Sequence, residues 1–236
     1  MKYMGSKRRI RNELIQVIQN RSSMDKPWVE PFIGGANMIE VVKSGERFGS
    51  DVDPCIIRAL KFIRDSPNAI PLSKSDFSED AYREIRLKRK DDLTDLECYA
   101  GYAFSYGGKW LGGWCRDSAG KRDYVAEAYR NSIKQHKSIQ GVNLRCCDYT
   151  DVNISRPSII YCDPPYRGTT KYNNTFDYDR FYAWCVEKHS LGHDVYISEY
   201  NMPSGFKCLW SKEIVSSLTK DTGAKKGTES LFIVEG

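Results

Sequence analysis

The sequence lacks the cysteine and histidine patterns of metal sites and of disulfide scaffolds. It has eight cysteines but no C-x-x-C pair, and it has only three histidines. Cys146 and Cys147 are adjacent, which disfavours a bridge between them. Because the compact spacings of zinc ligands are absent, we expect reduced thiols and no bound metal.

Long apolar runs are missing as well. No stretch approaches the roughly 18 apolar residues that indicate a membrane span. Residues 1–5 are too polar for the core of a signal peptide. We therefore expect a cytoplasmic protein that does not associate with a membrane.

The bulk composition is that of an ordinary globular protein. Hydrophobic residues make up 40% and charged residues 28% of the 236 residues. This length suits one α/β domain with a sizeable insertion better than two independent domains. The formal net charge of +5 favours an anionic partner, but many proteins without such a partner are equally basic.

Two blocks of alternating helix and strand patterns flank a segment of different character. The first block predicts a helix, a strand, a glycine-rich turn, a helix and a strand at residues 8–20, 26–30, 31–35, 36–43 and 47–50. The second predicts a helix at 179–190 and strands at residues 142–146, 158–162, 194–198 and 230–234. Such units build a Rossmann-like doubly wound α/β sheet, here a mixed one. We predict that residues 1–58 and 144–236 form this sheet domain.

Residues 59–143 show no clear strand alternation and predict an inserted, mainly helical subdomain. One helix is predicted at 124–138. Another is predicted to carry the basic run at 83–90, although such a run is usually a solvated helix face.

The tetrapeptide Asp163-Pro164-Pro165-Tyr166 follows the strand predicted at 158–162, where open α/β sheets bind ligands. A chance match in a chain of this size is expected on the order of a tenth of a per cent of the time. The alternative is a turn in which the prolines merely end the strand.

These residue types suit transfer of a group to a conjugated amine such as N6 of adenine. Asp163 and the backbone carbonyl of Pro164 can each accept an amine hydrogen, and both prolines fix the backbone. The ring of Tyr166 can stack on a planar base. We therefore predict Asp163, Pro164, Pro165 and Tyr166 as the catalytic residues.

Five further motifs accompany the tetrapeptide, and together they span nearly the whole chain. They are Tyr3-Met4-Gly5-Ser6-Lys7, Glu30-Pro31-Phe32-Ile33-Gly34-Gly35, Asp51-Val52-Asp53, Cys147-Asp148-Tyr149 and Ile197-Ser198-Glu199-Tyr200-Asn201. In type and order the chain resembles the Dam-like, D12-class DNA adenine methyltransferases of the α-group, especially small phage and prophage members. The resemblance implies a class I methyltransferase fold, S-adenosylmethionine as cofactor, double-stranded DNA as partner and a bacterial host cell.

The resemblance also implies a set of cofactor-binding residues. They are Tyr3, Gly5, Lys7, Phe32, Gly34, Gly35, Asp51, Asp148, Tyr149 and Asp163. In the family, the acid at the position of Asp51 accepts hydrogen bonds from the ribose hydroxyls of the cofactor. The acid at the position of Asp148 binds the adenine amine of the cofactor. Ala36 stands where the family often has a second glycine, and the Gly34-Gly35 turn alone could be an ordinary loop. Asp53 could instead cap the next helix.

Glycines, aromatic residues and basic residues are interleaved in residues 104–116, with no acid between Glu97 and Asp117. Such a loop can approach phosphates closely and insert an aromatic ring between bases. Because a duplex hides adenine N6, the target base must be flipped out. The predicted DNA-contacting residues, including those bordering the base pocket, are Lys109, Trp110, Trp114, Arg116, Lys121, Arg122, Tyr200 and Asn201. Trp110 and Trp114 could instead anchor the core of the insertion.

Two alternative functions stay open. An N4-cytosine DNA methyltransferase uses a similar geometry, although aspartate as the first residue of the tetrapeptide favours adenine in this resemblance. A catalytically silent DNA-binding protein could keep the same fold, but the intact motifs argue against decay. We expect a monomer, because the enzyme would act on one strand at a time.

Overall fold

The computed structural model describes residues 1–43, 45–167, 176–215 and 226–235. Seven strands of this part of the chain form one sheet in the order β3-β2-β1-β4-β5-β7-β6. The strands are β1 (Trp28–Glu30), β2 (Arg47–Asp51), β3 (Asn143–Cys146), β4 (Ile159–Cys162), β5 (Asp194–Glu199), β6 (Phe206–Val215) and β7 (Lys226–Val234). The five strands β1 to β5 run parallel to one another, whereas β7 is antiparallel to both β5 and β6. The predicted mixed, Rossmann-like α/β sheet is therefore confirmed.

The central strands β1 and β4 are buried along their whole length. Parallel strands covered on both faces read as continuous apolar runs, which is why the sequence Ile159-Ile160-Tyr161-Cys162 predicts a strand. Alternate residues of β4 face two different cores: Ile159 and Tyr161 belong to one and Ile160 and Cys162 to the other. The sheet is thus packed on both faces.

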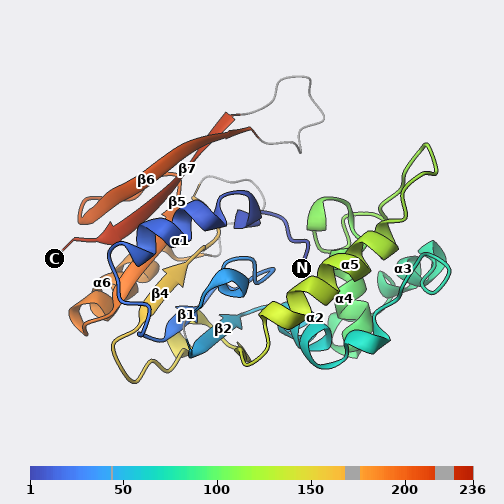
Figure 1. The fold of residues 1–236 in the computed structure, drawn as a ribbon, viewed down its shortest axis with the longest axis horizontal. Helices are drawn as coiled ribbons and strands as arrows, with labels where there is room; N and C mark the ends of the chain where they lie inside the picture. The colour runs from blue at the N-terminus through green and yellow to red at the C-terminus, as the bar shows by residue number, and fades with distance from the viewer. Residues whose placement is uncertain (44, 168–175, 216–225, 236) are drawn as a thin grey trace.

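Helices cover both faces of the sheet (Figure 1). On one face α1 (Arg11–Gln19) contributes Leu14 and Ile18 to the core that contains Tyr161. On the other, α6 (Tyr178–Ser190) contributes Phe181 and Cys185 to the core that contains Ile160.

The insertion is a group of helices beside the sheet (Figure 1). It comprises α3 (Glu79–Ile85), α4 (Asp95–Ala103) and α5 (Tyr124–Ser138), and both α4 and α5 pack against α2 (Pro54–Asp65). Within residues 66–142, all of them described, the only strand-like pairing is an isolated bridge between Ser105 and Trp114. The predicted helical character is confirmed, and the predicted helix at 124–138 is α5.

Helix α2 spans the predicted boundary between the sheet domain and the insertion, which was placed between residues 58 and 59. Asp53 accepts a hydrogen bond from the backbone N–H of Cys55 at 2.9 Å, and Pro54 occupies the first turn. This is the capping role considered for Asp53. Because α2 contacts both β3 and α4, one helix joins the sheet to the insertion.

Two local predictions are wrong, and one strand was not predicted. Residues 36–43 form no α-helix but only a 3-10 helix at Ile39–Val41, and Ala36, where the predicted helix would begin, has a φ of 57°, outside the α-helical region. Helix α3 ends at Ile85, so most of the basic run at 83–90 lies beyond it. Strand β6 was not predicted, because an irregularity between Cys208 and Trp210 breaks the alternation of this edge strand.

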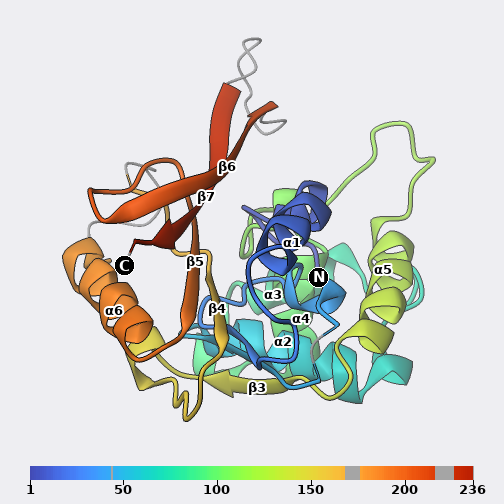
Figure 2. The ribbon, with the colours of Figure 1, turned by 60° about the vertical axis from the view of Figure 1, so that its left-hand side comes forward.

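The hairpin β6–β7 and the segment before α5 rise on the same side of the molecule, with α1 between them (Figure 1 and Figure 2). The amino terminus lies between the sheet and the insertion (Figure 1). There the backbone N–H of Met4 donates to the carbonyl of Gly108 at 3.1 Å. In the described ranges, no helix has the length and apolarity needed to cross a membrane.

Candidate active site

An acidic residue lies at the carboxyl end of each of four neighbouring parallel strands. Asp51 and Glu30 end β2 and β1, Glu199 ends β5, and Asp163 directly follows β4. Because these strands are parallel and adjacent, the four carboxyl groups lie along one border of the sheet, which we call the carboxyl edge. The chain leaves the sheet in opposite directions on either side of β1 and β4, the usual location of a ligand site in such sheets.

Burial raises the pKa of every acid at the carboxyl edge. The pKa of Glu30 is raised to about 8, that of Glu199 to about 7 and that of Asp51 to about 6, and the pKa of Asp163 is also raised. Desolvation is the largest cause in each case, because a charge loses its hydration when it is buried. A ligand with positive charge would favour the ionised forms, so the edge suits a cation.

Asp163 is paired with a buried lysine from the amino-terminal motif. The ammonium of Lys7 lies 2.8 Å from Oδ1 of Asp163 and also donates to the carbonyl of Gly5 at 3.2 Å. The Lys7 side chain is only 5% exposed. Burial alone would lower the pKa of Lys7, but the charges of Asp163 and Glu229 outweigh it and raise that pKa. These charges favour the cationic form of Lys7 beside the segment Asp163-Pro164-Pro165-Tyr166, which we call the acceptor turn.

Tyr166 is held on several sides. Its hydroxyl donates to Oε2 of Glu229 at 2.7 Å, and the Lys7 ammonium lies 4.6 Å from the centre of its ring. The ring of Tyr200 meets it edge-on, with the centroids 4.6 Å apart. Burial raises the pKa of Tyr166 well above its usual value, so the hydroxyl stays a donor. The structure thus brings the acceptor turn, Lys7 and Tyr200 together.

The two prolines of the acceptor turn and the residues that flank it complete this arrangement. Pro164 is buried and Pro165 is half-buried. Glu199 accepts hydrogen bonds from the backbone N–H groups of Tyr200 at 2.7 Å and of Arg167 at 3.1 Å. It thereby fixes the backbone just after Tyr166. Asn201 is exposed next to Tyr200.

Asp51 is tied to the glycine-rich turn. Its carboxyl group accepts the backbone N–H of Gly34 at 3.1 Å and that of Asp53 at 3.0 Å. Gly34 has a φ of 45°, and a Cβ atom there would lie 2.7 Å from the Tyr3 ring. Only glycine fits this position without strain. Beside it, the carbonyl of Gly35 accepts a hydrogen bond from the amino group of Met1 at 2.8 Å.

Phe32 and Tyr149 lie together at the same end of the sheet. Their rings stack with centroids 5.4 Å apart, and Phe181 of α6 meets both edge-on. Asp148 accepts hydrogen bonds from the backbone N–H of Thr150 at 3.0 Å and from its hydroxyl at 2.7 Å. The predicted cofactor residues therefore come from five separate parts of the chain but gather at one end of the sheet.

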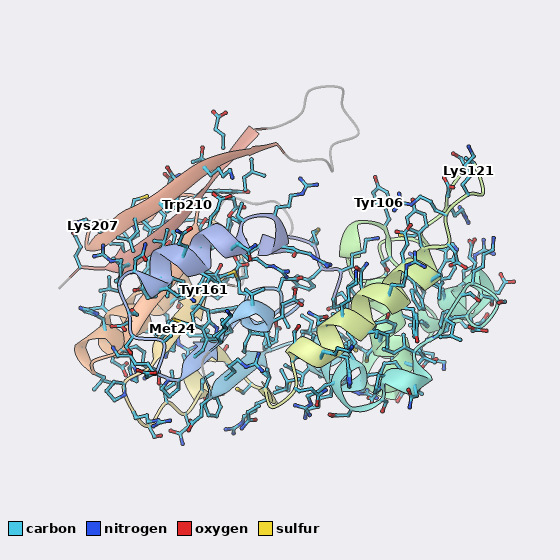
Figure 3. All side chains as sticks on the ribbon, in the orientation of Figure 1. Met24, Tyr106, Lys121, Tyr161, Lys207 and Trp210 are labelled. Atoms are coloured by element: carbon cyan, nitrogen blue, oxygen red, sulfur yellow. The ribbon has the colours of Figure 1, made fainter. Side chains whose placement is uncertain are left out.

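The predicted DNA-contacting residues of the insertion are less uniform. Trp110 and Trp114 are half-buried: Trp110 packs against Tyr102 at 4.8 Å between ring centroids, and Trp114 packs against Tyr82 at 5.5 Å. Arg116 is exposed but paired with Glu79, and Arg122 is paired with Glu127 at 2.7 Å. Lys109 and Lys121 are exposed, and Figure 3 shows Lys121 at the outer end of the insertion.

Three residues with notable positions were not singled out from the sequence. Glu229 of β7 contacts Tyr166, as described above, and nothing in its local sequence indicates this. Val52 is 71% exposed although it directly follows Asp51 at the carboxyl edge. Tyr106 is 64% exposed and points outward from the insertion (Figure 3).

Comparisons with solved structures show remote likeness only. One is to SMU.472, a putative methyltransferase complexed with SAH, with 12% identity and a TM-score of 0.38, covering 98% of this chain and 52% of that one. Another is to a putative methyltransferase from Thermoplasma acidophilum, with 12% identity and a TM-score of 0.26, covering 51% of this chain and 54% of that one. The chain thus spans about half the length of these solved chains. Curated proteins include no significant sequence match.

A family comparison extends over most of the sequence. Residues 3–201 match the model of the D12 class N6 adenine-specific DNA methyltransferase family. This range includes the amino-terminal motif with Lys7, the carboxyl edge and the acceptor turn, all of which the structure brings together. The chain therefore belongs to the D12 class N6 adenine-specific DNA methyltransferases.

Proposed function

We propose that this protein transfers a methyl group from S-adenosylmethionine to N6 of an adenine that is flipped out of double-stranded DNA. The observation that carries the proposal is the acceptor turn: Asp163 lies at the carboxyl end of a central buried strand, paired with Lys7 and next to the ring of Tyr166. Membership of the family supports the choice of adenine.

The residues at the carboxyl edge fit S-adenosylmethionine. The cofactor carries a sulfonium and an ammonium, and the edge offers four carboxyl groups whose ionised forms a cation would stabilise. Asp51 can accept two ribose hydroxyls, the exposed side chain of Val52 can cover a flat ring, and the Gly34 turn allows close approach of the backbone. Tyr3, Gly5, Lys7, Phe32, Gly35, Asp148 and Tyr149 complete the proposed cofactor site. When bound, the cofactor supplies a methyl group on a positively charged sulfur.

The protein's own part in the reaction is to hold and polarise the amine. The adenine N6 lone pair is conjugated with the ring, so the amine must be pulled towards a tetrahedral shape before it can attack. Asp163 and the carbonyl of Pro164 each accept one N6 hydrogen, and the prolines keep that carbonyl in place. Alignment of the amine with the methyl group provides most of the remaining rate enhancement. The extra proton leaves to water.

Recognition of DNA falls to the insertion. The exposed Lys109 and Lys121 can contact phosphates directly, whereas Arg116 and Arg122 would exchange their carboxylate partners for phosphates. Trp110 and Trp114 stay proposed contacts, and the exposure of Tyr106 makes it a further aromatic candidate. Tyr200 and Asn201 border the base pocket next to Tyr166. The enzyme would act as a monomer in the cytoplasm of a bacterial cell.

One experiment tests the proposed function. Purified protein is incubated with labelled S-adenosylmethionine and mixed-sequence duplex DNA, the DNA is digested, and the methylated nucleoside is identified by mass. N6-methyladenine is expected. N4-methylcytosine would instead establish the cytosine enzyme, and DNA binding without any transfer would establish a silent DNA-binding protein.

A further inference from the structure

Strand β7 brings a carboxylate to the acceptor turn from the far end of the chain. In the antiparallel pairing of β5 with β7, Glu199 lies opposite Ser230, so Glu229 is one residue away from the partner of Glu199. The side chain of Glu229 is 18% exposed. The pairing register therefore places two acids on the acceptor turn, Glu199 from β5 and Glu229 from β7.

The two acids hold different parts of the turn. Glu199 accepts backbone N–H groups, including that of Arg167, and so fixes the path of the chain. Glu229 contacts only side chains among the hydrogen bonds and ion pairs of the described residues. Its Oε2 atom accepts the Tyr166 hydroxyl at 2.7 Å and lies 3.7 Å from the Lys7 ammonium. One carboxylate oxygen thus serves both groups that surround Asp163.

These contacts limit two movements. A hydrogen bond from a phenol to a carboxylate is charge-assisted and directional, so it restrains the tilt of the Tyr166 ring, which also contacts Lys7 and Tyr200. Lys7 lies 2.8 Å from Asp163 on one side and 3.7 Å from Glu229 on the other. When an amine takes the place of Lys7 at Asp163, the buried ammonium still has Glu229 as a partner. An unpaired buried charge would be costly.

We propose that Glu229 is a positioning residue that orients the Tyr166 ring and provides the second resting place for Lys7, so that Asp163 becomes available to the adenine amine. The inference rests on the proposed function, since it concerns the same acceptor site. It assigns a role to the antiparallel hairpin β6–β7, which otherwise only completes the sheet.

Three substitutions separate the two contacts. Glu229→Gln keeps an oxygen that can accept the Tyr166 hydroxyl but removes the charge that faces Lys7. Glu229→Ala removes both contacts, and Tyr166→Phe removes only the hydroxyl. Glu235→Gln is the matched control, because Glu235 is an exposed acid just beyond the other end of β7.

The expected kinetics follow from these contacts. Glu229→Ala should lower kcat about 10- to 100-fold, the cost of one charge-assisted contact, with less than about a threefold change in the Kd for S-adenosylmethionine. Combining Glu229→Ala with Tyr166→Phe should lower kcat less than the product of the single effects, because both remove the same hydrogen bond. Multiplicative effects, or a Glu229→Ala enzyme as active as Glu235→Gln, would overturn the proposal.

A second measurement does not depend on methyl transfer and tests the contact between Glu229 and Lys7 directly. The pKa of the Lys7 ammonium, followed by NMR of selectively labelled lysine, should fall in Glu229→Gln and stay unchanged in Glu235→Gln, because the Glu229 charge raises it. If the wild-type protein transfers no methyl group to any DNA base, the proposed function fails, and this titration alone decides the role of Glu229. An unchanged Lys7 pKa in Glu229→Gln then overturns the inference. Equal losses of cofactor binding and transfer with a lowered melting temperature would likewise reduce Glu229 to a structural residue.

Discussion

The carboxyl edge and the insertion hold their charged groups in opposite ways. At the edge the acids are largely buried and their pKa values are raised by desolvation, and the cation beside Asp163, Lys7, is buried too. In the insertion, Arg116 and Arg122 are mostly exposed and are paired with surface acids. Charges that have lost their hydration act strongly on a bound group, whereas exposed pairs are weak and screened by salt. The comparison supports the proposal that the reaction takes place at the edge and that the insertion makes exchangeable phosphate contacts.

The largest effect should come from the edge. Asp163→Ala removes the acceptor for an N6 hydrogen and should lower kcat about 100- to 1,000-fold, the usual consequence of deleting one polar group that stabilises a transition state. Binding of S-adenosylmethionine, measured by calorimetry, should be largely retained. Equal loss of transfer and of cofactor binding would indicate a folding defect and erase the distinction between the two regions.

A second test of the edge concerns Asp51. Asp51→Asn should weaken S-adenosylmethionine binding about 10- to 100-fold, because a charged acceptor of two hydroxyls is replaced by a neutral one. Burial raises the pKa of Asp51 to about 6, so wild-type affinity should fall as the pH falls through that value. The pH dependence should be weaker in Asp51→Asn and unchanged in Asp25→Asn, an exposed control distant in sequence from the edge. An Asp51→Asn enzyme with the wild-type pH profile would contradict this role.

The buried charge at the edge should also be visible in stability. Burial raises the pKa of Glu30 to about 8, so the folded protein keeps a proton that the unfolded chain loses above its ordinary pKa. The free energy of unfolding should therefore decrease as pH rises from the unfolded pKa towards about 8. Glu30→Gln removes this dependence and should be the more stable protein at pH 9 by on the order of 2 kcal/mol. Thermal unfolding at pH 6 and pH 9 measures the difference, and parallel curves for the two proteins would refute it.

The smallest effects are expected in the insertion. Lys121→Ala and Arg116→Ala should each weaken binding of duplex DNA only a few-fold and reduce the slope of log affinity against log salt by about 1. The free energy of unfolding should change by less than about 0.5 kcal/mol, because both side chains are exposed. Fluorescence anisotropy at several salt concentrations measures both quantities. If either substitution abolished cofactor binding, the insertion would be part of the reaction site and the contrast with the edge would be lost.

Predictions from the sequence succeeded where the pattern was local. The strand before Asp163 is a short apolar run, and α5 shows a helical period, so β4 and α5 were both predicted near their observed bounds. They failed where a single residue changed the pattern. The positive φ of Ala36 ended the expected helix, and the irregularity after Cys208 concealed β6.

The candidate site shows the same division. The acceptor turn and the strand-end acids Asp51 and Asp163 were recognisable in the sequence, because each belongs to a short motif attached to a strand. The folded chain alone shows that Lys7 pairs with Asp163 and that Glu229 accepts the Tyr166 hydroxyl. It also shows that the two tryptophans pack while Tyr106 stays exposed. These contacts join segments far apart in the chain through sheet order and strand register. A charged or aromatic side chain carries no local sign of which partner that register will bring to it.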